Sequence, residues 1–298
     1  MRRHIETAGT KHGKRGMLLH GLCRALLFAA GALTAGCEEQ PPPVTRADER
    51  PEAVKKDRPA DVRAPAVAGS FYKGSAAALS ADVKSRLAKA ARPGFAAGSV
   101  LGLLVPHAGY VYSGDTAAAA FKAVEGAEFE VVVLIGAPHR RGVSFASVGG
   151  YDAYRTPLGD APVDASAAAE LVSAGIPFVR EAHEQEHSLE VQLPFIQTVL
   201  PKASILPVLV GTDEPAEQRR AAEMIHRAVS GRKALVVIST DLSHYPEYDV
   251  AVLADKAVLD AVLKLAPDVI RGVVKAVSYT HLRAHETVLD LVCRLLLE

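Results

Sequence analysis

Three histidines that follow apolar runs give this chain its candidate chemistry. His107 follows the run VLGLLVP, His139 follows EVVVLIGAP, and His244 follows ALVVISTDLS. Such runs are typical of buried strands. Ligands of an open α/β sheet bind outside the carboxyl ends of its strands, so we expect the three imidazoles to converge at one edge. Neutral imidazole is the commonest protein metal ligand, and the pattern therefore predicts a metal site.

Two further residues are expected near this edge. Asp241 lies three residues before His244 and could orient that ring, or another ligand, by accepting an N–H bond. His187 and Glu190 are expected to face the site from a loop and a first helical turn, with Ser188 as the helix cap.

The stretch HEQEH, from His183 to His187, also matches the HExxH pattern of zinc peptidases. In those enzymes both histidines bind zinc from one face of a helix, and the glutamate activates water. Here the stretch follows an expected strand, and Pro194 interrupts the continuation of a helix. The peptidase interpretation is therefore the weakest of those considered.

Composition limits the classes of function. The chain has 298 residues, 49% of them hydrophobic, with 34 basic and 34 acidic side chains and a formal net charge of zero. This balance, together with the absence of Trp, gives no basis for nucleic-acid binding. Of the three cysteines, Cys23 and Cys37 lie near the N-terminus and leave only Cys293, so no intramolecular disulfide framework is expected.

The N-terminal region is expected to lie outside the folded domain. Residues 1–37 combine a basic stretch with a short apolar segment and end in LTAGC, which resembles a lipobox with Cys37 as the lipidated residue. Met17 is an alternative start. Residues 38–62 are rich in proline and charge and predict a disordered tether. We therefore expect an exported protein, anchored by lipid to the periplasmic face of a bacterial membrane.

The folded domain is expected to span residues 63–276. Strand-like and helix-like segments alternate there, which predicts a single α/β domain whose mainly parallel or mixed central sheet has helices on both faces. One expected helix covers Thr116–Val124 and is capped by Asp115. From Val277 the alternation stops, and residues 277–298 resemble a translated sequencing adapter rather than a native C-terminus. The zinc-like spacing of histidines in that tail carries no site assignment.

Seven motifs in order resemble the Memo-like family, whose bacterial members are called AmmeMemoRadiSam system protein B. They run from about Arg63 to Leu265 and read RAPAVAGSFY, VPHAGYVYSG, LIGAPHRRG, YRTPLGD, EQEHSLEVQLPF, ILPVLVG and STDLSHY. The resemblance implies a fold like that of the class III extradiol non-heme iron dioxygenases. It also implies one metal ion per chain, iron or copper.

The resemblance assigns roles residue by residue. It implies that His107 and His139 are metal ligands, and that His187, Asp241 and His244 line the pocket, with His244 as the acid/base. The family's third ligand is a cysteine of a Cys-Gly-Arg motif further along the chain. Cys293 does not stand in such a motif, so the ligand role is not transferred to it.

Two functions of different classes follow. The first is a redox or dioxygenase-like reaction on a small substrate at a mononuclear metal, with His244 positioned by Asp241. The alternative is a non-catalytic module that binds a peptide or a metal ion. The sequence does not decide between them and does not indicate the oligomeric state.

Overall fold

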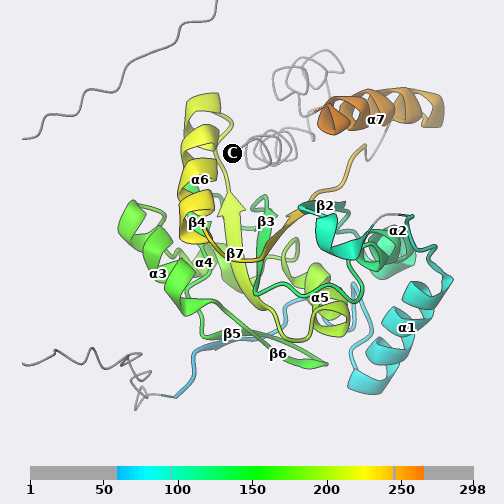
Figure 1. Cartoon of the computed structure of the whole chain (residues 1–298), viewed down its shortest axis with the longest axis horizontal. Coiled ribbons are helices and arrows are strands. Elements are labelled where there is room, and N and C mark those ends of the chain that lie inside the picture. The colour runs from blue at the N-terminus through cyan, green and yellow to red at the C-terminus, as the bar shows by residue number, and fades with distance from the viewer. Residues whose placement is uncertain (1–58, 95, 244–245, 265–298) are drawn as a thin grey trace, which may run out of the picture. The chain divides into compact units, whose positions relative to one another are not determined.

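The protein is described by a computed structural model that covers residues 59–94, 96–243 and 246–264. Its central element is a five-stranded sheet with the strand order β2-β8-β3-β7-β4 (Figure 1). The strand bounds, in chain order, are β2 Gly102–Val105, β3 Val131–Gly136, β4 Ala146–Val148, β7 Ser204–Val210 and β8 Ala234–Ser239.

Four of the five strands are parallel. β8 pairs with β2 on one side and with β3 on the other, and β3 pairs with β7, all in parallel register. Only the edge strand β4 is antiparallel to its neighbour β7. Every residue of β3 is buried, as a strand covered on both faces requires. The carboxyl ends of β2, β8 and β3 therefore lie next to one another at the same edge.

Helices cover both faces of this sheet. The connection β2–α2–β3 crosses the sheet in one direction and β7–α6–β8 in the other, so right-handed crossovers place α2 and α6 on opposite faces. Figure 1 shows α3 and α6 to one side and α1, α2 and α5 to the other, in agreement with the helix contacts. The helix bounds are α1 Ala76–Lys89, α2 Tyr110–Lys122, α3 Ala165–Ala174, α4 Arg180–Glu184, α5 Leu193–Val199, α6 Pro215–Ala228 and α7 Tyr248–Leu263.

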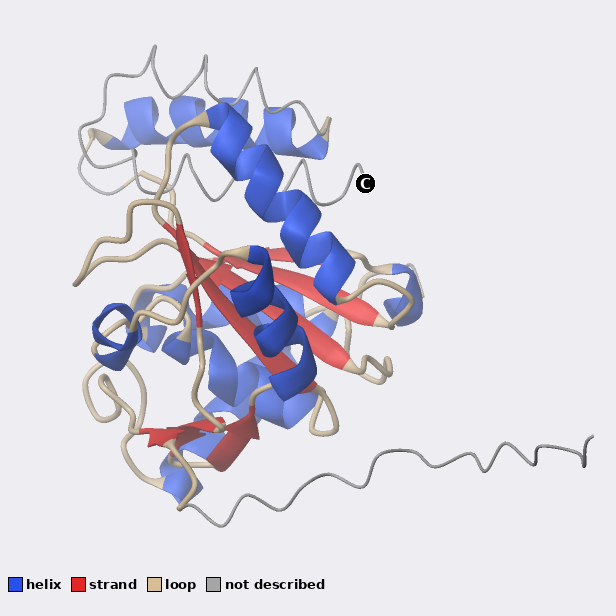
Figure 2. Cartoon of the chain, turned by 90° about the vertical axis from the view of Figure 1, so that its left-hand side faces the viewer, coloured by secondary structure: helices blue, strands red, loops and turns tan. Residues whose placement is uncertain are grey.

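A second, smaller sheet lies below the first (Figure 2). It has the order β1-β5-β6, and β1 is parallel to β5 while β6 is antiparallel to it. Two short 3₁₀ turns, η1 and η2, complete the described elements. The bounds are β1 Val62–Arg63, β5 Ala153–Thr156, β6 Gly159–Pro162, η1 Ala97–Ser99 and η2 Glu190–Gln192.

The expected fold class is confirmed: this is an α/β domain with mixed sheets flanked by helices, consistent with an extradiol dioxygenase-like fold. The expected start of the helix after β2 is wrong. α2 begins at Tyr110, six residues earlier than predicted, after Gly109. Asp115 is consequently inside the helix, where its carboxylate accepts a hydrogen bond from Arg86 at 2.7 Å instead of capping.

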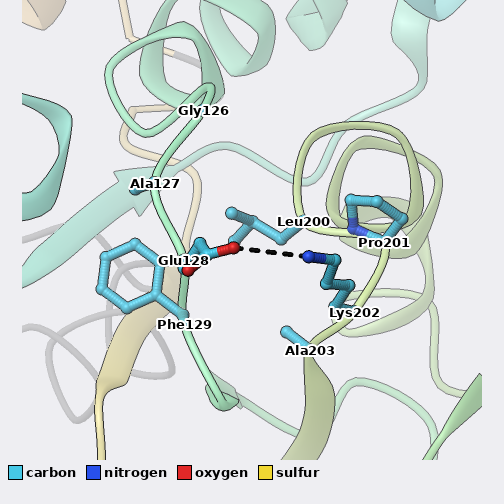
Figure 3. A pocket seen from close by; sticks show the side chains of 8 residues that line it. All are labelled: Gly126, Ala127, Glu128, Phe129, Leu200, Pro201, Lys202 and Ala203. Atoms are coloured by element: carbon cyan, nitrogen blue, oxygen red, sulfur yellow. Dashed lines mark hydrogen bonds and ion pairs between the residues drawn. The ribbon is translucent and has the colours of Figure 1, made fainter.

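A shallow, largely apolar hollow lies at the opposite end of the strands from the histidines. It lies between the segments that lead into β3 and β7, and Lys202 makes an ion pair with Glu128 at 3.3 Å across it (Figure 3). This hollow is at the amino ends of the strands and is thus remote from the histidines.

No helix in the described part of the chain is long and apolar enough to cross a membrane.

Candidate metal centre

The parallel strands bring His107 and His139 to one place. Val105 and Gly136, the last residues of β2 and β3, are both in register with Ser239, the last residue of β8 between them. His107 follows β2 by two residues and His139 follows β3 by three. The centroids of the two imidazole rings are 4.9 Å apart. The two side chains therefore converge at the carboxyl ends of the strands, as predicted.

His187 completes the cluster from a segment outside the sheet. Its ring centroid lies 5.5 Å from that of His107 and 4.6 Å from that of His139. Each of the three rings offers one ligand atom such that these atoms all lie within 4.8 Å of one another. The sequence pattern assigned the third strand-end imidazole to His244, which lies outside the described residues; the third ring in the described structure is that of His187.

A glycine lets the His187 segment approach the sheet. A Cβ atom on Gly136 would lie 2.6 Å from Ser188 Oγ and 3.0 Å from Leu189 Cδ2, so a larger residue would push this segment away. With that room, Ser188 Oγ donates a hydrogen bond of 3.2 Å to the carbonyl of Ala137. The 186–189 segment thus lies directly against the end of β3.

Glu186 holds His139 in place. Its Oε1 accepts a hydrogen bond from His139 Nδ1 at 2.9 Å, and its Oε2 accepts one from the His139 backbone N–H at 2.5 Å. Burial alone would raise the pKa of Glu186, but the hydrogen bonds and charge of His139 outweigh it and lower that pKa to about 2. The ionised carboxylate can only accept, so His139 carries a proton on Nδ1, and Nε2 is the ring nitrogen that could bind a metal ion.

His107 is buried and neutral. Burial, which is the largest cause, and the neighbouring imidazoles of His139 and His187 together lower its pKa to about 3. Its backbone N–H donates to Asp241 Oδ1 at 2.6 Å, and Asp241 Oδ2 lies 3.9 Å from its Nε2. Asp241 therefore lies beside the cluster and fixes the backbone that carries His107.

His187 supplies the observation that best fits a metal ion. Its Nδ1 is buried and has no hydrogen-bond partner. Glu186 Oε1 is 3.4 Å away, but that oxygen already accepts bonds from His139 Nδ1 and from the N–H groups of His187 and Ser188. Burial also lowers the pKa of His187, which keeps the ring neutral. Three convergent imidazoles, one with an orphaned nitrogen, form a donor set that suits a transition-metal ion.

A buried ion pair supports the cluster from behind. Arg63, with 2% of its surface exposed, donates to Glu190 Oε2 at 2.6 Å and to the carbonyl oxygens of His183 and Glu186. Glu190 also accepts from Tyr72 Oη and from the backbone of residues 66 and 67. The expectation that Glu190 faces the site is therefore wrong, because its carboxylate anchors the N-terminal segment.

Ser188 does not cap the following turn as expected. The residue before η2 is Leu189, and the turn has no side-chain cap. Instead, the hydroxyl of Ser188 is directed to the Ala137 carbonyl described above. Pro194 interrupts nothing, since it lies within the first two residues of α5, where a missing N–H is tolerated.

The HExxH resemblance has no structural counterpart. α4 ends at Glu184, so His183 and His187 do not share a helix. His183 is buried elsewhere, with its Nδ1 2.9 Å from Tyr154 Oη and its Nε2 3.1 Å from Ser147 Oγ. Both ring nitrogens of His183 are thus engaged by hydroxyl groups, and the peptidase interpretation is not supported by this geometry.

Sequence reasoning missed Gln192 and Ser239 as contributors to the site. It did not decide whether Glu186 is a site carboxylate or a solvated residue, and in the structure Glu186 is 1% exposed. A carboxylate between two histidines in the sequence was the available signal. For Ser239 the signal was weaker: a hydroxyl as the last residue of an otherwise apolar strand. Cys293 lies outside the described residues.

The chain was compared with known proteins. It matches the Memo-like protein family over residues 63–286, a match that extends past the expected domain end at Ala276. A MEMO1 family protein of Metallosphaera sedula is 37% identical over 211 residues, which cover 66% of this chain and 74% of the relative. Those of Thermotoga maritima and Nitrosopumilus maritimus are 34% and 33% identical, and the matches cover 79% and 76% of those relatives.

The match covers most of the chain, includes every residue of the histidine cluster, and is accompanied by relatives above 30% identity. This protein belongs to the Memo-like family.

Proposed function

We propose that this protein holds one metal ion on His107, His139 and His187. The supporting observation is the convergence of three imidazoles whose ligand atoms lie within 4.8 Å of one another. Two of these side chains follow the ends of β2 and β3, the strands on either side of β8, so little reorganisation would accompany binding. Membership of the Memo-like family supports the roles of His107 and His139, whereas the role of His187 is inferred from the geometry alone.

We propose iron or copper as the ion and an oxidation of a small substrate, similar to that of dioxygenases, as the reaction. A bound iron or copper ion would supply the redox chemistry. Glu186 would keep His139 oriented through its Nδ1–H, and Asp241 would hold the His107 backbone. Asp241 is also proposed to orient His244 as general acid/base, a role that concerns a residue outside the described ranges.

Metal content of the purified full chain tests the first part. We expect about one iron or copper ion per wild-type chain and less than a tenth of that in His107→Ala, since loss of one of three ligands removes the site. His226→Ala is the matched control, because His226 is an exposed histidine on α6. Stoichiometric metal in His107→Ala, measured by mass spectrometry of the acid-digested protein, would contradict the assignment.

Oxygen consumption separates catalysis from binding. The metal-loaded chain is offered a panel of catechol-like substrates, and we expect oxygen uptake that disappears in Asp241→Asn. Metal binding without any uptake across the panel would instead favour a non-catalytic metal-binding module. Cleavage of casein that is lost in Glu184→Gln would favour the peptidase interpretation and overturn this proposal.

We also propose that the chain is exported and carries lipid on Cys37, as its N-terminal residues suggest. Labelling with a palmitate analogue in a bacterial host tests this. Incorporation that is equal in wild type and Cys37→Ser would contradict the proposal. These residues lie outside the described ranges.

A further inference from the structure

One buried hydroxyl contacts three parts of the candidate metal centre. Ser239, at the end of β8, is completely buried. Its Oγ lies 2.5 Å from the Ser188 carbonyl oxygen, 2.9 Å from Gln192 Nε2 and 3.1 Å from His107 Nδ1. The strand β8 lies between the strands that carry His107 and His139, so this oxygen lies directly behind the cluster.

The hydrogen-bond roles of these contacts are fixed by chemistry. A hydroxyl has one proton to donate and two lone pairs that accept. The Ser188 carbonyl can only accept, so it must receive the Ser239 proton. Gln192 Nε2 can only donate, and this assignment of its amide is secured by a second bond of 2.9 Å to the carbonyl of Pro106. One lone pair of Ser239 therefore remains for His107.

His107 Nδ1 must then be the donor. If Nδ1 were unprotonated, its lone pair would face a lone pair of Ser239, because the only hydroxyl proton is engaged by Ser188. The ring is 1% exposed and lies against the imidazoles of His139 and His187, an environment that disfavours a second proton, so it carries a single proton. With that proton on Nδ1, the lone pair of His107 is on Nε2, the nitrogen on the side of Asp241.

We propose that Ser239 is a positioning residue that selects the Nδ1–H tautomer of His107 and so prepares Nε2 to bind a metal ion. Glu186 does the same for His139 with a carboxylate, and Ser239 does it with a neutral hydroxyl. His107 and His139 thus both carry a proton on Nδ1, but a hydroxyl group fixes it in one and a carboxylate in the other. This inference rests on the proposed metal site for its effect on affinity, whereas the tautomer itself belongs to the metal-free protein.

The tautomer is tested in the metal-free full chain labelled with ¹⁵N. Long-range ¹H–¹⁵N spectra distinguish an imidazole protonated on Nδ1 from one protonated on Nε2, and His107→Ala identifies the signals. We expect wild-type His107 to carry its proton on Nδ1, and Ser239→Ala to show a mixture or the Nε2–H form. Ser239→Thr keeps the hydroxyl and should restore the wild-type pattern. Wild-type His107 protonated on Nε2 would overturn the inference.

Affinity provides the second measurement. Fe²⁺ is titrated anaerobically against a competing chelator, and we expect Ser239→Ala to bind about 10-fold to 100-fold more weakly than wild type, as for other residues that orient metal ligands. Ser147→Ala is the matched control, since Ser147 is equally buried and contacts His183 Nε2 at 3.1 Å. It should leave both the His107 tautomer and Fe²⁺ affinity unchanged.

The two arms fail separately. A wild-type chain that binds no Fe²⁺ but shows the Nδ1–H tautomer contradicts the proposed function and leaves the role of Ser239 supported. Wild-type tautomer and wild-type affinity in Ser239→Ala would overturn the role of Ser239 and leave the metal site intact. Should Ser239→Ala fail to fold, the wild-type spectrum and Ser239→Thr decide, because the wild-type tautomer alone can refute the inference.

Discussion

The described structure contains two groups of histidines that differ in how their ring nitrogens are used. The ring of His183 has a hydroxyl partner at each nitrogen, Tyr154 on one side and Ser147 on the other. In the cluster of His107, His139 and His187, the contacts of Nδ1 orient two rings toward a shared centre, and the Nδ1 of the third is an orphan. A fully satisfied imidazole indicates a structural role, whereas convergent, incompletely satisfied imidazoles indicate a ligand.

Removing Arg63 should have the largest effect on stability. Its guanidinium contacts the backbone of both groups, at His183 and at Glu186 beside the metal cluster. It donates to the carbonyl of His183 and to that of Glu186, and it pairs with the fully buried Glu190. Arg63→Met leaves that carboxylate buried without its partner, so we expect the free energy of unfolding to fall by about 3–5 kcal/mol. Urea denaturation measures it.

A joint substitution sharpens this prediction. Arg63→Met with Glu190→Gln should recover part of the lost stability, since no uncompensated charge remains buried. An unchanged urea midpoint in Arg63→Met alone would show that the pair does not support the fold.

Acid should destabilise the metal-free chain through His183. Burial and the charge of Arg63 lower the pKa of His183 to about 4. In the unfolded chain the imidazole of His183 takes up a proton near pH 6.5, whereas in the folded chain it does so only near pH 4. The contribution of His183 to stability is therefore complete above pH 6.5 and is lost as the pH falls toward 4. The loss attributable to His183 is on the order of 3 kcal/mol.

The measurement is the free energy of unfolding at several pH values between 4 and 7, in wild type and in His183→Gln. Other groups titrate in this range, and the difference between the two proteins isolates His183. Equal slopes would mean that His183 is protonated in the fold as readily as in the unfolded chain.

Gly136→Ala should affect the metal cluster and leave the His183 group unchanged. The added Cβ would lie 2.6 Å from Ser188 Oγ, so the His187 segment must shift away from the sheet. We expect a loss of about 1–3 kcal/mol in stability, as for other overpacked sites, together with weaker Fe²⁺ binding. Thermal unfolding and the chelator competition measure the two effects; wild-type values for both would show that the segment yields freely.

Lys202→Ala should have the smallest effect on stability, because Lys202 contacts neither His183 nor the metal cluster. Its ion pair with Glu128 crosses the hollow at the other edge of the sheet (Figure 3), and both side chains are well exposed. Exposed pairs contribute about 0–1 kcal/mol. A change in metal affinity in Lys202→Ala would show that the two sheet edges are coupled, contrary to the separation described above.

The sequence was sufficient to predict the α/β sheet and the residues that follow directly after its parallel strands. The alternation of apolar runs and helices predicts the α/β sheet, and parallel strands deliver the residues after their ends to one edge. His107 and His139 were placed together on this basis alone. The prediction depended on local pattern and on one topological rule, and both were sufficient for these two residues.

His187 and Glu190 show where such reasoning stops. Which of two nearby polar residues faces the site depends on Arg63, which is 127 residues away from Glu190 in the sequence. It also depends on the space left by Gly136. Neither a distant ion pair nor a missing Cβ leaves a periodic signal near residue 187. The start of α2 was misjudged for a related reason, because Asp115 is a good cap by type but serves as a partner of Arg86.

The placement of Arg63 matters for anyone who shortens this protein for laboratory work. The Asp61 carboxylate pairs with Arg180, and the backbone N–H of Asp61 donates to Asp152 Oδ2 at 2.7 Å, so residues just ahead of the Memo-like match are also attached to the domain. A fragment that begins at Arg63 would lose the contacts of Asp61, and one that begins after Arg63 would also leave Glu190 buried without its counterion. Truncation from the N-terminal side should therefore keep Asp61 and everything after it.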